Sequence, residues 1–364
     1  MHYNKYFGFL LLLILFSCDP FNTIIEDEKI QVIQYEAAEQ KTPSTIDSLV
    51  KVATWNIKFG GGRIDFFFDC HGDRVLMKEA EVLENMAAIA VKVSSMDADI
   101  LFLQEVDIDS KRSAYVDQIQ YLLDNTDYNY AVYASQWQAD YVPSDGVGQV
   151  NSGNAILSKY PLNNAERIAL PLIEEQSGIV KYFYLRRNIL LADITLNGEN
   201  ITVLNTHTSA YSTDGTKKQQ LEIIEKKMAE LNAANKRFII GGDFNNLPPN
   251  SLLYCDFDDN ACTEASGYEP QACDVLLEEL SNMNIFLKYD AAIPQAKYES
   301  NQPIFGTFTS DKNGFWNRKL DYIFTNGDFV ANSGLVHQGI SSGGIATMPL
   351  SDHAPITTVY RLNK

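Results

Sequence analysis

Basic residues are scarce in this chain. Lysine and arginine together number 29, against 47 aspartates and glutamates, and the formal net charge is −18. An acidic surface repels polyanions, so the charge disfavours nucleic acid as a partner. It does not exclude nucleic acid, because a bound divalent metal ion supplies positive charge at the place where a phosphate binds.

The start of the chain lacks a hydrophobic run long enough to cross a bilayer. The apolar residues 7–16, which follow Lys5, are too few to span a membrane but have the proportions of a secretory signal peptide. The stretch LLILFSCDPFN resembles a bacterial lipoprotein signal, in which a lipidated cysteine becomes the mature N-terminus. We therefore expect export to the bacterial cell envelope, with Cys18 as a lipid anchor in the membrane. The alternative is an ordinary cleaved signal with an incidental cysteine.

Cysteine is also rare, with five in 364 residues. Apart from Cys18, these are Cys70, Cys255, Cys262 and Cys273. The last three form a cluster that lacks a nearby histidine and the paired short spacings of a zinc site. In an oxidising compartment the four could form disulfides in three alternative pairings. A local disulfide in a surface loop is the favoured interpretation, and free thiols are the alternative.

The chain divides into three parts. Residues 1–17 are the expected signal peptide, residues 18–48 an acidic tether, and residues 49–364 one large domain. Within the domain, apolar strands such as VKVATWNIKF and ADILFLQEVD alternate irregularly with helices predicted near residues 78–93 and 219–231. This irregular alternation indicates mixed sheets covered by helices, not a doubly wound parallel sheet.

Amides, carboxylates and histidines recur where apolar strands begin or end. Each has an ordinary structural explanation when it is taken alone, such as a turn acid or a satisfied core histidine. Together they predict one shared site, because buried carboxylates are costly unless they are paired or bound to a cation. The set comprises Asn56, Glu105, Asn205, His207, Asp243, Asn245, Asp321, Asp352 and His353.

The ordered motifs from TWNIKF to SDHAPI, over about 300 residues, resemble the endonuclease/exonuclease/phosphatase superfamily, whose fold is also called deoxyribonuclease-like. The resemblance implies an α/β fold, a four-layer sandwich of two mixed β-sheets packed face to face with helices on the outside. It also implies a phosphoester hydrolase with Mg2+ or Mn2+ as cofactor. Such hard ions take oxygen ligands and keep several waters.

The resemblance assigns roles around the metal ion and the attacking water. Glu105 would be the principal metal ligand, with Asn56 beside it and Asp352 completing the set. Asp243 would orient or deprotonate the water, while Asn245 would hold the water or the phosphate.

Two histidines are expected at the phosphate. His353 would contact it as a general base or as a hydrogen-bond donor, and Asp321 would fix the tautomer of that histidine. His207 would face the phosphate from the other side and could protonate the leaving group. The candidate substrate-binding residues are Asn154, Asn205 and Arg187, of which Arg187 has the alternative of pairing with a surface acid.

The sequence leaves the substrate open among phosphoesters. NTHTSAY carries a histidine where abasic-site repair nucleases of the family typically do not, and the motifs typical of inositol polyphosphate 5-phosphatases are missing. We favour a phosphodiesterase that acts outside the cytoplasm on small or lipid-linked substrates. The first alternative is a secreted-type non-specific nuclease on DNA or RNA, and the second is an inactive binding protein tethered to the envelope. Phe66, Phe67 and Phe68, in a glycine-flanked loop, either contact the substrate or pack onto the domain.

Overall fold

The computed structural model describes most of the chain after residue 30. The expected signal segment and all five cysteines lie outside the described residues. Among the helices that are described, none has the length and apolarity needed to cross a membrane. The described ranges are 31–43, 45–46, 48–69, 72–174, 185–210, 214–252, 285–313, 315–339 and 346–363.

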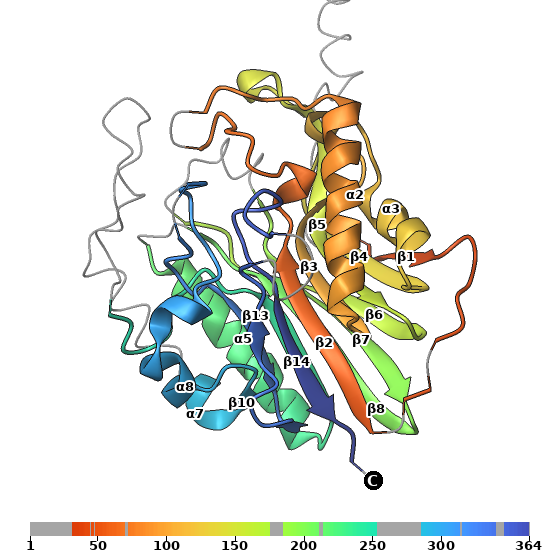
Figure 1. The fold of residues 1–364 in the computed structure, drawn as a ribbon, viewed down its shortest axis with the longest axis vertical. Helices are drawn as coiled ribbons and strands as arrows, with labels where there is room; N and C mark the ends of the chain where they lie inside the picture. Colours follow the sequence, from red (N-terminus) through yellow and green to blue (C-terminus); the bar gives the residue numbers. More distant parts are fainter. Residues whose placement is uncertain are drawn as a thin grey trace, which may run out of the picture.

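Two mixed β-sheets form the centre of the molecule (Figure 1). The first sheet has the strand order β1-β4-β5-β3-β2-β14-β12, with β13 paired to β14. Its strands are β1 (Ile33–Glu36), β2 (Leu49–Asn56), β3 (Ile100–Asp107), β4 (Tyr130–Val142), β5 (Gly148–Ser158), β12 (Asp328–Phe329), β13 (Leu335–Val336) and β14 (Ile356–Arg361).

The second sheet has the strand order β10-β11-β9-β8-β7-β6. Each sheet contains one parallel pair, β2 with β3 and β8 with β9, and the remaining described pairings are antiparallel. The strands are β6 (Leu162–Ala169), β7 (Asn188–Leu196), β8 (Glu199–His207), β9 (Arg237–Asp243), β10 (Asp290–Ala291) and β11 (Asp321–Thr325).

An apolar core joins the two sheets face to face. Alternate residues of a strand point to the same side, so Ile100 and Phe102 of β3 meet Ile201 and Val203 of β8 in one buried cluster. The approach is close where the sheets cross. A Cβ at Gly241 in β9 would lie 2.4 Å from the ring of Phe102, so only glycine fits there.

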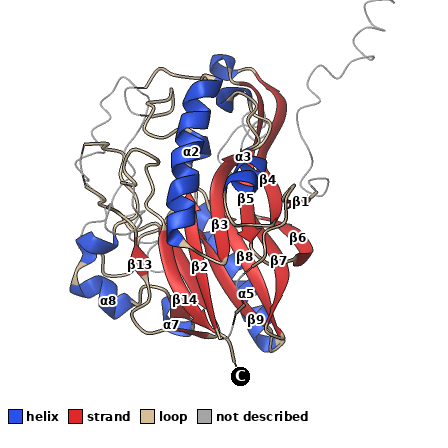
Figure 2. Cartoon of the chain, turned by 45° about the vertical axis from the view of Figure 1, so that its right-hand side comes forward, coloured by secondary structure: helices blue, strands red, loops and turns tan. Residues whose placement is uncertain are grey.

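Helices cover the outer face of each sheet. The helices α2 (Glu79–Met96) and α3 (Gln118–Asn125) pack on the first sheet, and α5 (Thr216–Ala233) and α7 (Ile285–Lys288) pack on the second. Figure 2 shows α2 and α5 on opposite sides of the strands, and a short helix, α8 (Gln295–Ser300), lies near α7. The four-layer sandwich that the resemblance implies is therefore confirmed.

Five of the described strands were not predicted from the sequence: the two-residue strands β10, β12 and β13, and the longer strands β1 and β6. Strand β1 belongs to the segment interpreted as a tether, yet it pairs with β4 at the edge of the first sheet, with Ile33 opposite Tyr133. Strand β6 has the sequence LNNAERIA, too polar for the sequence analysis to predict it, and it is the edge strand beside β7. Polar edge strands are typical of sheets that avoid pairing with other molecules.

The glycine-flanked loop packs onto the domain in part. The ring of Phe66 is fully buried, and it stacks on the ring of Phe68 at 5.6 Å between centroids and meets Phe59 edge to face at 4.9 Å. Phe68 is the outermost member of this stack, with 52% of its surface exposed. The loop is thus fixed by Phe66 and presents Phe68 to solvent.

Candidate active site

The strand topology brings the polar strand ends to one edge of the sandwich. Parallel strands end on the same side, so Asn56 at the end of β2 lies near Glu105 in β3, and His207 at the end of β8 lies directly beside Asp243 of β9. Antiparallel β11 begins at this same edge, where Asp321 is the register partner of Asp243. In Figure 1 this edge is the upper end, and the C-terminus lies at the lower end.

A β-bulge aims Glu105 into the site. The pairing of β3 with β5 shifts between Leu103 and Val106, and Glu105 has a left-handed φ of 55°. A non-glycine residue in that conformation costs of order 1–3 kcal/mol and persists where the surrounding structure imposes it. The bulge turns the Glu105 side chain out of the regular alternation, and 33% of this side chain stays exposed.

Asn56 connects the carboxylates of the two sheets. Its Nδ2 donates to Glu105 Oε1 and to Asp243 Oδ2, both at 3.1 Å. Its Oδ1 accepts from the backbone N–H of Lys58 at 3.0 Å. The structure therefore differs from the expectation that Asn56 is a metal ligand, because its amide nitrogen, and not its oxygen, faces the carboxylates.

His353 lies between two buried carboxylates. Its Nδ1 is 2.8 Å from Asp321 Oδ2, and its Nε2 is 3.5 Å from Asp243 Oδ2. Burial alone would lower the pKa of His353, but the two aspartates outweigh it and raise the pKa to about 10. At neutral pH the ring is an imidazolium that donates from both nitrogens. Of the two expected roles, donor and general base, the geometry supports the donor.

His207 is in the opposite state. Burial, followed by the charges of Arg187 and His353, holds the pKa of His207 well below its usual range. Its Nε2 lies 3.4 Å from Asp243 Oδ2 and 4.0 Å from Glu105 Oε1. A neutral imidazole can donate a hydrogen bond but has no acidic proton to give at neutral pH, so the structure does not support His207 as the acid for the leaving group.

The carboxyl group of Asp243 has a pKa close to neutral pH. Its side chain is 1% exposed, and burial is the main cause that raises its pKa to about 7, although His353 acts in the other direction. The backbone of Asn245 donates to Asp243 Oδ1 at 2.9 Å. A carboxyl group with this pKa can accept and release a proton near pH 7, as a general base must.

Asn245 follows Asp243 in a left-handed conformation, with φ of 46°. Its side-chain Nδ2 donates to the carbonyl of Thr208 at 3.0 Å, and its own carbonyl accepts from Lys217 Nζ at 2.9 Å. Asparagine tolerates this backbone region better than most residues. The turn places the Asn245 side chain beside the end of β8, where the site also holds His207.

The three residues expected to bind substrate lie in different environments. Asn205 is fully buried between the sheets, and its amide group donates to the carbonyls of Leu103 at 2.7 Å and Ala155 at 2.8 Å. Because both amide hydrogens are used, Asn205 joins the sheets and has no donor left for a substrate. This position differs from the expected role.

Asn154 and Arg187 are also buried, but their side chains have other partners. Asn154 Nδ2 donates to Asn188 Oδ1 at 3.2 Å, and its own Oδ1 is buried without a hydrogen-bond partner among the described residues. Arg187 donates to Gln136 Oε1 at 3.0 Å, and its charge reaches the ring of His207. Both remain candidates for substrate binding.

Glu105 and Asp352 fit a divalent metal ion. Burial and the charge of Asp352 raise the pKa of Glu105, so the two carboxylates are neighbours whose repulsion a cation would relieve. Burial would raise the pKa of Asp352 too, but Lys58 and His353 lower it overall. This pair of hard oxygen donors, one of them open to solvent, suits Mg2+ or Mn2+.

A second group of potential ligands comprises Asp243, Asp321 and His353, whose ligand atoms lie within 4.8 Å of one another. Their geometry suits a hydrogen-bonded triad better than a metal centre. Metal binding requires a neutral imidazole, whereas these two carboxylates hold the His353 ring in its protonated form.

Two buried lysines near the site escape the sequence analysis. Lys58 Nζ lies 3.0 Å from Asp69 and 3.6 Å from Asp352. Lys319, two residues before Asp321, is 2% exposed. Both lysines stand inside motifs that the sequence analysis singles out, TWNIKF and NRKLDYIF. A lysine in such an apolar motif indicates a buried ammonium group that needs a counter-charge.

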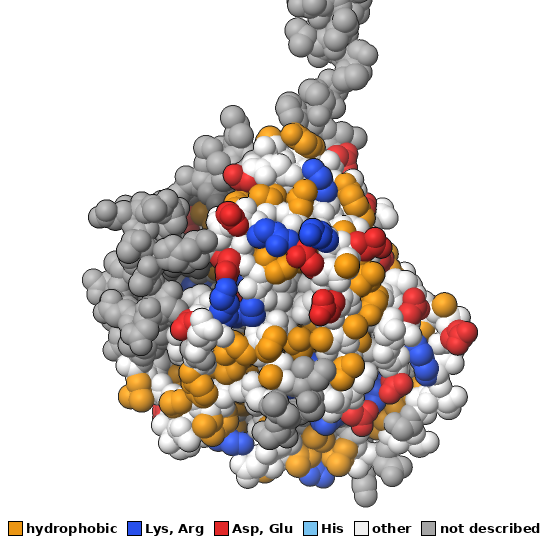
Figure 3. All heavy atoms as spheres, turned by 45° about the horizontal axis from the view of Figure 1, so that its top comes forward, with side chains coloured by type: hydrophobic (Ala, Val, Ile, Leu, Met, Phe, Trp, Pro, Cys, Tyr) orange, Lys and Arg blue, Asp and Glu red, His pale blue; other side chains and the backbone are white. Residues whose placement is uncertain are grey.

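Figure 3 turns the site end of the molecule toward the viewer. Lysine and arginine side chains gather near the middle of this face, beside aspartates and glutamates.

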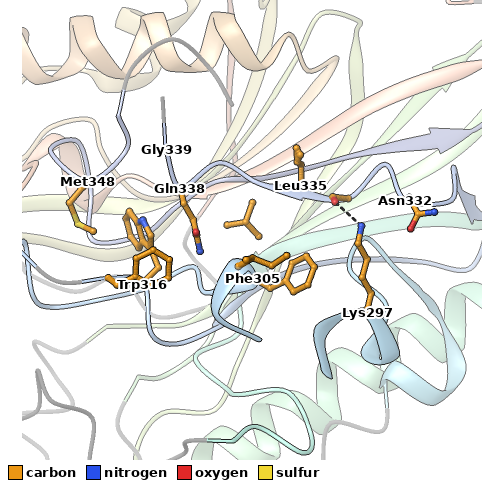
Figure 4. A pocket seen from close by; sticks show the side chains of 12 residues that line it. Lys297, Phe305, Trp316, Asn332, Leu335, Gln338, Gly339 and Met348 are labelled. Carbon is orange, nitrogen blue, oxygen red and sulfur yellow. Dashed lines mark hydrogen bonds between the residues drawn. The ribbon is translucent and has the colours of Figure 1, made fainter. Parts of the chain in front are cut away.

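A separate hollow of about 740 Å³ is shown in Figure 4. Its lining includes Phe305, Trp316, Leu335 and Met348 but none of the strand-end polar residues, so it is distinct from the candidate site.

Comparisons with known proteins identify the family of the chain. The model of the endonuclease/exonuclease/phosphatase family matches residues 53–353. An endonuclease/exonuclease/phosphatase from Beutenbergia cavernae has a similar structure, with a TM-score of 0.57 and 17% identity over 87% of this chain and 72% of that one. One from Bacteroides vulgatus has a TM-score of 0.50 and 15% identity over 87% of this chain and 100% of that one. No curated protein matches the sequence significantly. The family match spans most of the chain, from the first strand of the domain to His353, and the chain therefore belongs to the endonuclease/exonuclease/phosphatase family.

Proposed function

We propose that the protein is a divalent-metal-dependent phosphodiesterase that hydrolyses its substrate by in-line attack of water on phosphorus. One observation carries this proposal. Asn56 bonds to both Glu105 and Asp243, and His207 and His353 each lie within 3.5 Å of the same Asp243 oxygen. A candidate metal ligand, a candidate base and a cationic donor thus lie within reach of one phosphate.

The reaction divides the work among these residues. Asp243 accepts the proton of the attacking water, for which its pKa of about 7 suits it. His353, held protonated by Asp321, donates a hydrogen bond to a phosphoryl oxygen as negative charge grows there. A divalent ion held by Glu105 and Asp352 would supply further positive charge to the phosphoryl and leaving oxygens.

Charge favours a diester over a monoester. The site gathers the carboxylates of Glu105, Asp243, Asp321 and Asp352 around the His353 imidazolium, with the Lys58 ammonium 3.6 Å from Asp352. A phosphodiester carries one negative charge at neutral pH, whereas a monoester carries nearly two. The less charged substrate is repelled less by these carboxylates.

A hydrolysis panel tests the proposal. The substrates are bis-p-nitrophenyl phosphate, sphingomyelin, an inositol phosphate and plasmid DNA, each with Mg2+, with Mn2+ and with EDTA. The His353→Gln variant is the control for contaminating activity. Metal-dependent release of p-nitrophenol or of the sphingomyelin headgroup is expected. DNA nicking alone would favour the nuclease instead, and silence on every substrate would contradict the proposal and favour the binding protein.

We propose further that the protein is exported and anchored in the cell envelope through Cys18. The support is the sequence LLILFSCDPFN, in which the cysteine follows a short apolar run and Ser17. The test compares the chain with its Cys18→Ser variant in a bacterial host fed labelled palmitate. Label in the membrane fraction only for the unaltered chain supports the anchor, and equal label in both proteins contradicts it.

A further inference from the structure

A buried lysine stands behind the His353–Asp321 pair. Lys319 Nζ donates to the backbone carbonyl of Asp321 at 2.7 Å and lies 4.0 Å from the centre of the Tyr322 ring. The side chain is almost fully buried. Burial of an ammonium group is costly unless it is paired with an opposite charge, so its position next to Asp321 calls for a reason.

The Asp321 carboxylate is incompletely satisfied. Its Oδ2 accepts from His353 Nδ1, and its Oδ1 is buried with no hydrogen-bond partner among the described residues. The His353 ring meets this carboxylate through the hydrogen bond, whereas Lys319 Nζ meets the backbone carbonyl of the same residue. Burial lowers the pKa of Lys319 to about 7, and the charge of Asp321 acts in the other direction and keeps the pKa from falling further.

We propose that Lys319 is a positioning residue for the phosphodiesterase reaction, because its ammonium balances the buried carboxylate of Asp321 and so keeps His353 oriented toward the phosphate. This role rests on the proposed function. It differs from that of a catalytic residue, since Lys319 touches Asp321 and Tyr322 and acts on the phosphate only through His353. The Tyr322 ring helps to hold the lysine in place, since its hydroxyl donates to the carbonyls of Asn246 at 2.6 Å and Lys319 at 2.9 Å.

A structural role for Lys319 makes different predictions. If the lysine only fastened the turn before β11, a neutral donor of similar length would replace it, and loss of activity would follow loss of stability. If its charge is what matters, a neutral donor fails while the fold persists. A neutral side chain in a buried site also avoids the desolvation cost of an ammonium group.

The experiment compares the full-length chain with the variants Lys319→Met, Lys319→Gln and Lys319→Arg. Lys319→Met retains the apolar stem, Lys319→Gln retains a hydrogen-bond donor, and Lys319→Arg retains the charge. Lys92→Met is the matched control, because Lys92 is a buried lysine of α2, outside the site. For each protein we would measure kcat and KM on bis-p-nitrophenyl phosphate, and Tm.

The charge role predicts a split between kcat and KM. We expect Lys319→Met and Lys319→Gln to lower kcat by at least about tenfold, part of what a positioned acid or base contributes, with KM within about twofold and Tm unchanged or raised. Lys319→Arg should lower kcat less than either neutral variant, and Lys92→Met should leave kcat unchanged. Full activity in Lys319→Gln, or a kcat that falls only together with Tm, would overturn the proposal.

A second measurement needs no activity. The chain has five histidines, so 15N-histidine labelling resolves few ring N–H signals, and His353→Gln identifies the one bonded to Asp321. We expect this low-field signal to move or vanish in Lys319→Met and to persist in Lys92→Met. An unchanged signal would refute the role of Lys319. Wild-type protein that hydrolyses no phosphoester would refute the proposed function, and the NMR result would still decide whether Lys319 controls the His353–Asp321 pair.

Discussion

Replacing Asp243 with asparagine should stabilise the protein while it abolishes hydrolysis. Burial raises the pKa of the Asp243 carboxyl from an ordinary 3.8 to about 7, so the folded state holds this proton more tightly than the unfolded chain does. Between these two values, stability falls as the pH rises. Since a tenfold change in proton affinity is worth about 1.4 kcal/mol, the ionised carboxylate costs the folded state about 4 kcal/mol above pH 7.

The asparagine removes that cost. The pKa of about 7 already includes the attraction between Asp243 and His353, whose atoms are 3.5 Å apart, so this attraction is not subtracted again. We therefore expect a gain of about 4 kcal/mol at pH 8 that shrinks toward zero near pH 4. The corresponding rise in Tm at pH 8 is about 8–16 °C, and kcat should fall by at least about 100-fold.

Thermal unfolding in EDTA from pH 4 to pH 8, with activity assays on the same samples, measures both effects. Asp321→Asn is the control, because it replaces the register partner of Asp243 but breaks the 2.8 Å bond to His353 and should destabilise the protein. A lower Tm for Asp243→Asn than for wild type at pH 8 would refute the reasoning, as would a gain that does not depend on pH.

Three further predictions concern the metal ion, the pH dependence and the aromatic loop. Glu105→Gln should raise the Mg2+ concentration needed for half-maximal activity by at least about tenfold, and a metal titration with an unaltered midpoint would contradict the assignment of Glu105. The profile of kcat/KM against pH should rise through about pH 7, as Asp243 loses its proton, and fall near pH 10, as His353 loses its own; a profile that is flat between pH 6 and pH 8 would count against Asp243 as the base. Phe66→Ala should cost about 3–5 kcal/mol of unfolding free energy because its ring is fully buried, whereas Phe68→Ala should cost less than about 1 kcal/mol; equal losses in denaturant unfolding would show that the loop packs differently.

The sequence predicts the site well where chemistry and strand ends coincide. Glu105, Asp243 and His353 are polar residues at the ends of apolar runs, and their separate positions in the chain meet because strands of each sheet end or begin at one edge. The hydrophobic periodicity of the sequence does not show that these three residues lie close together. The order of the motifs indicates it, through the family resemblance.

The sequence fails where backbone geometry and desolvation decide the outcome. The bulge that turns Glu105 and the amide orientation of Asn56 depend on pairings between β3 and β5 and on the backbone of Lys58, which no single segment encodes. Asn205 lies two residues before His207 in the same strand motif, LNTHT. Its side chain nevertheless points between the sheets and donates to the carbonyls of Leu103 and Ala155. Strand β6 is missed because an edge strand needs little hydrophobic alternation.

The buried lysines Lys58 and Lys319 are a further feature that the sequence alone does not predict. In most sequences a lysine is a solvated residue. Only the folded structure shows that Lys58 is buried 3.6 Å from the carboxylate of Asp352 and that Lys319 is buried against the backbone carbonyl of Asp321. Their roles follow from the number of carboxylates that the fold concentrates at one edge, which no local pattern reveals.

The most direct test of the account is whether Glu105 and His353 act on the same phosphate. It compares kcat/KM for Mg2+-dependent hydrolysis of bis-p-nitrophenyl phosphate in wild type, Glu105→Gln, His353→Gln and the double variant. When two residues act as a unit, the effects of their substitutions on kcat/KM do not add as free energies. We therefore expect each single variant to lose at least about 100-fold in kcat/KM. The kcat/KM of the double variant should lie less than about tenfold below that of the less active single variant. Losses that multiply in full would contradict the account, because they would show two groups that contribute independently.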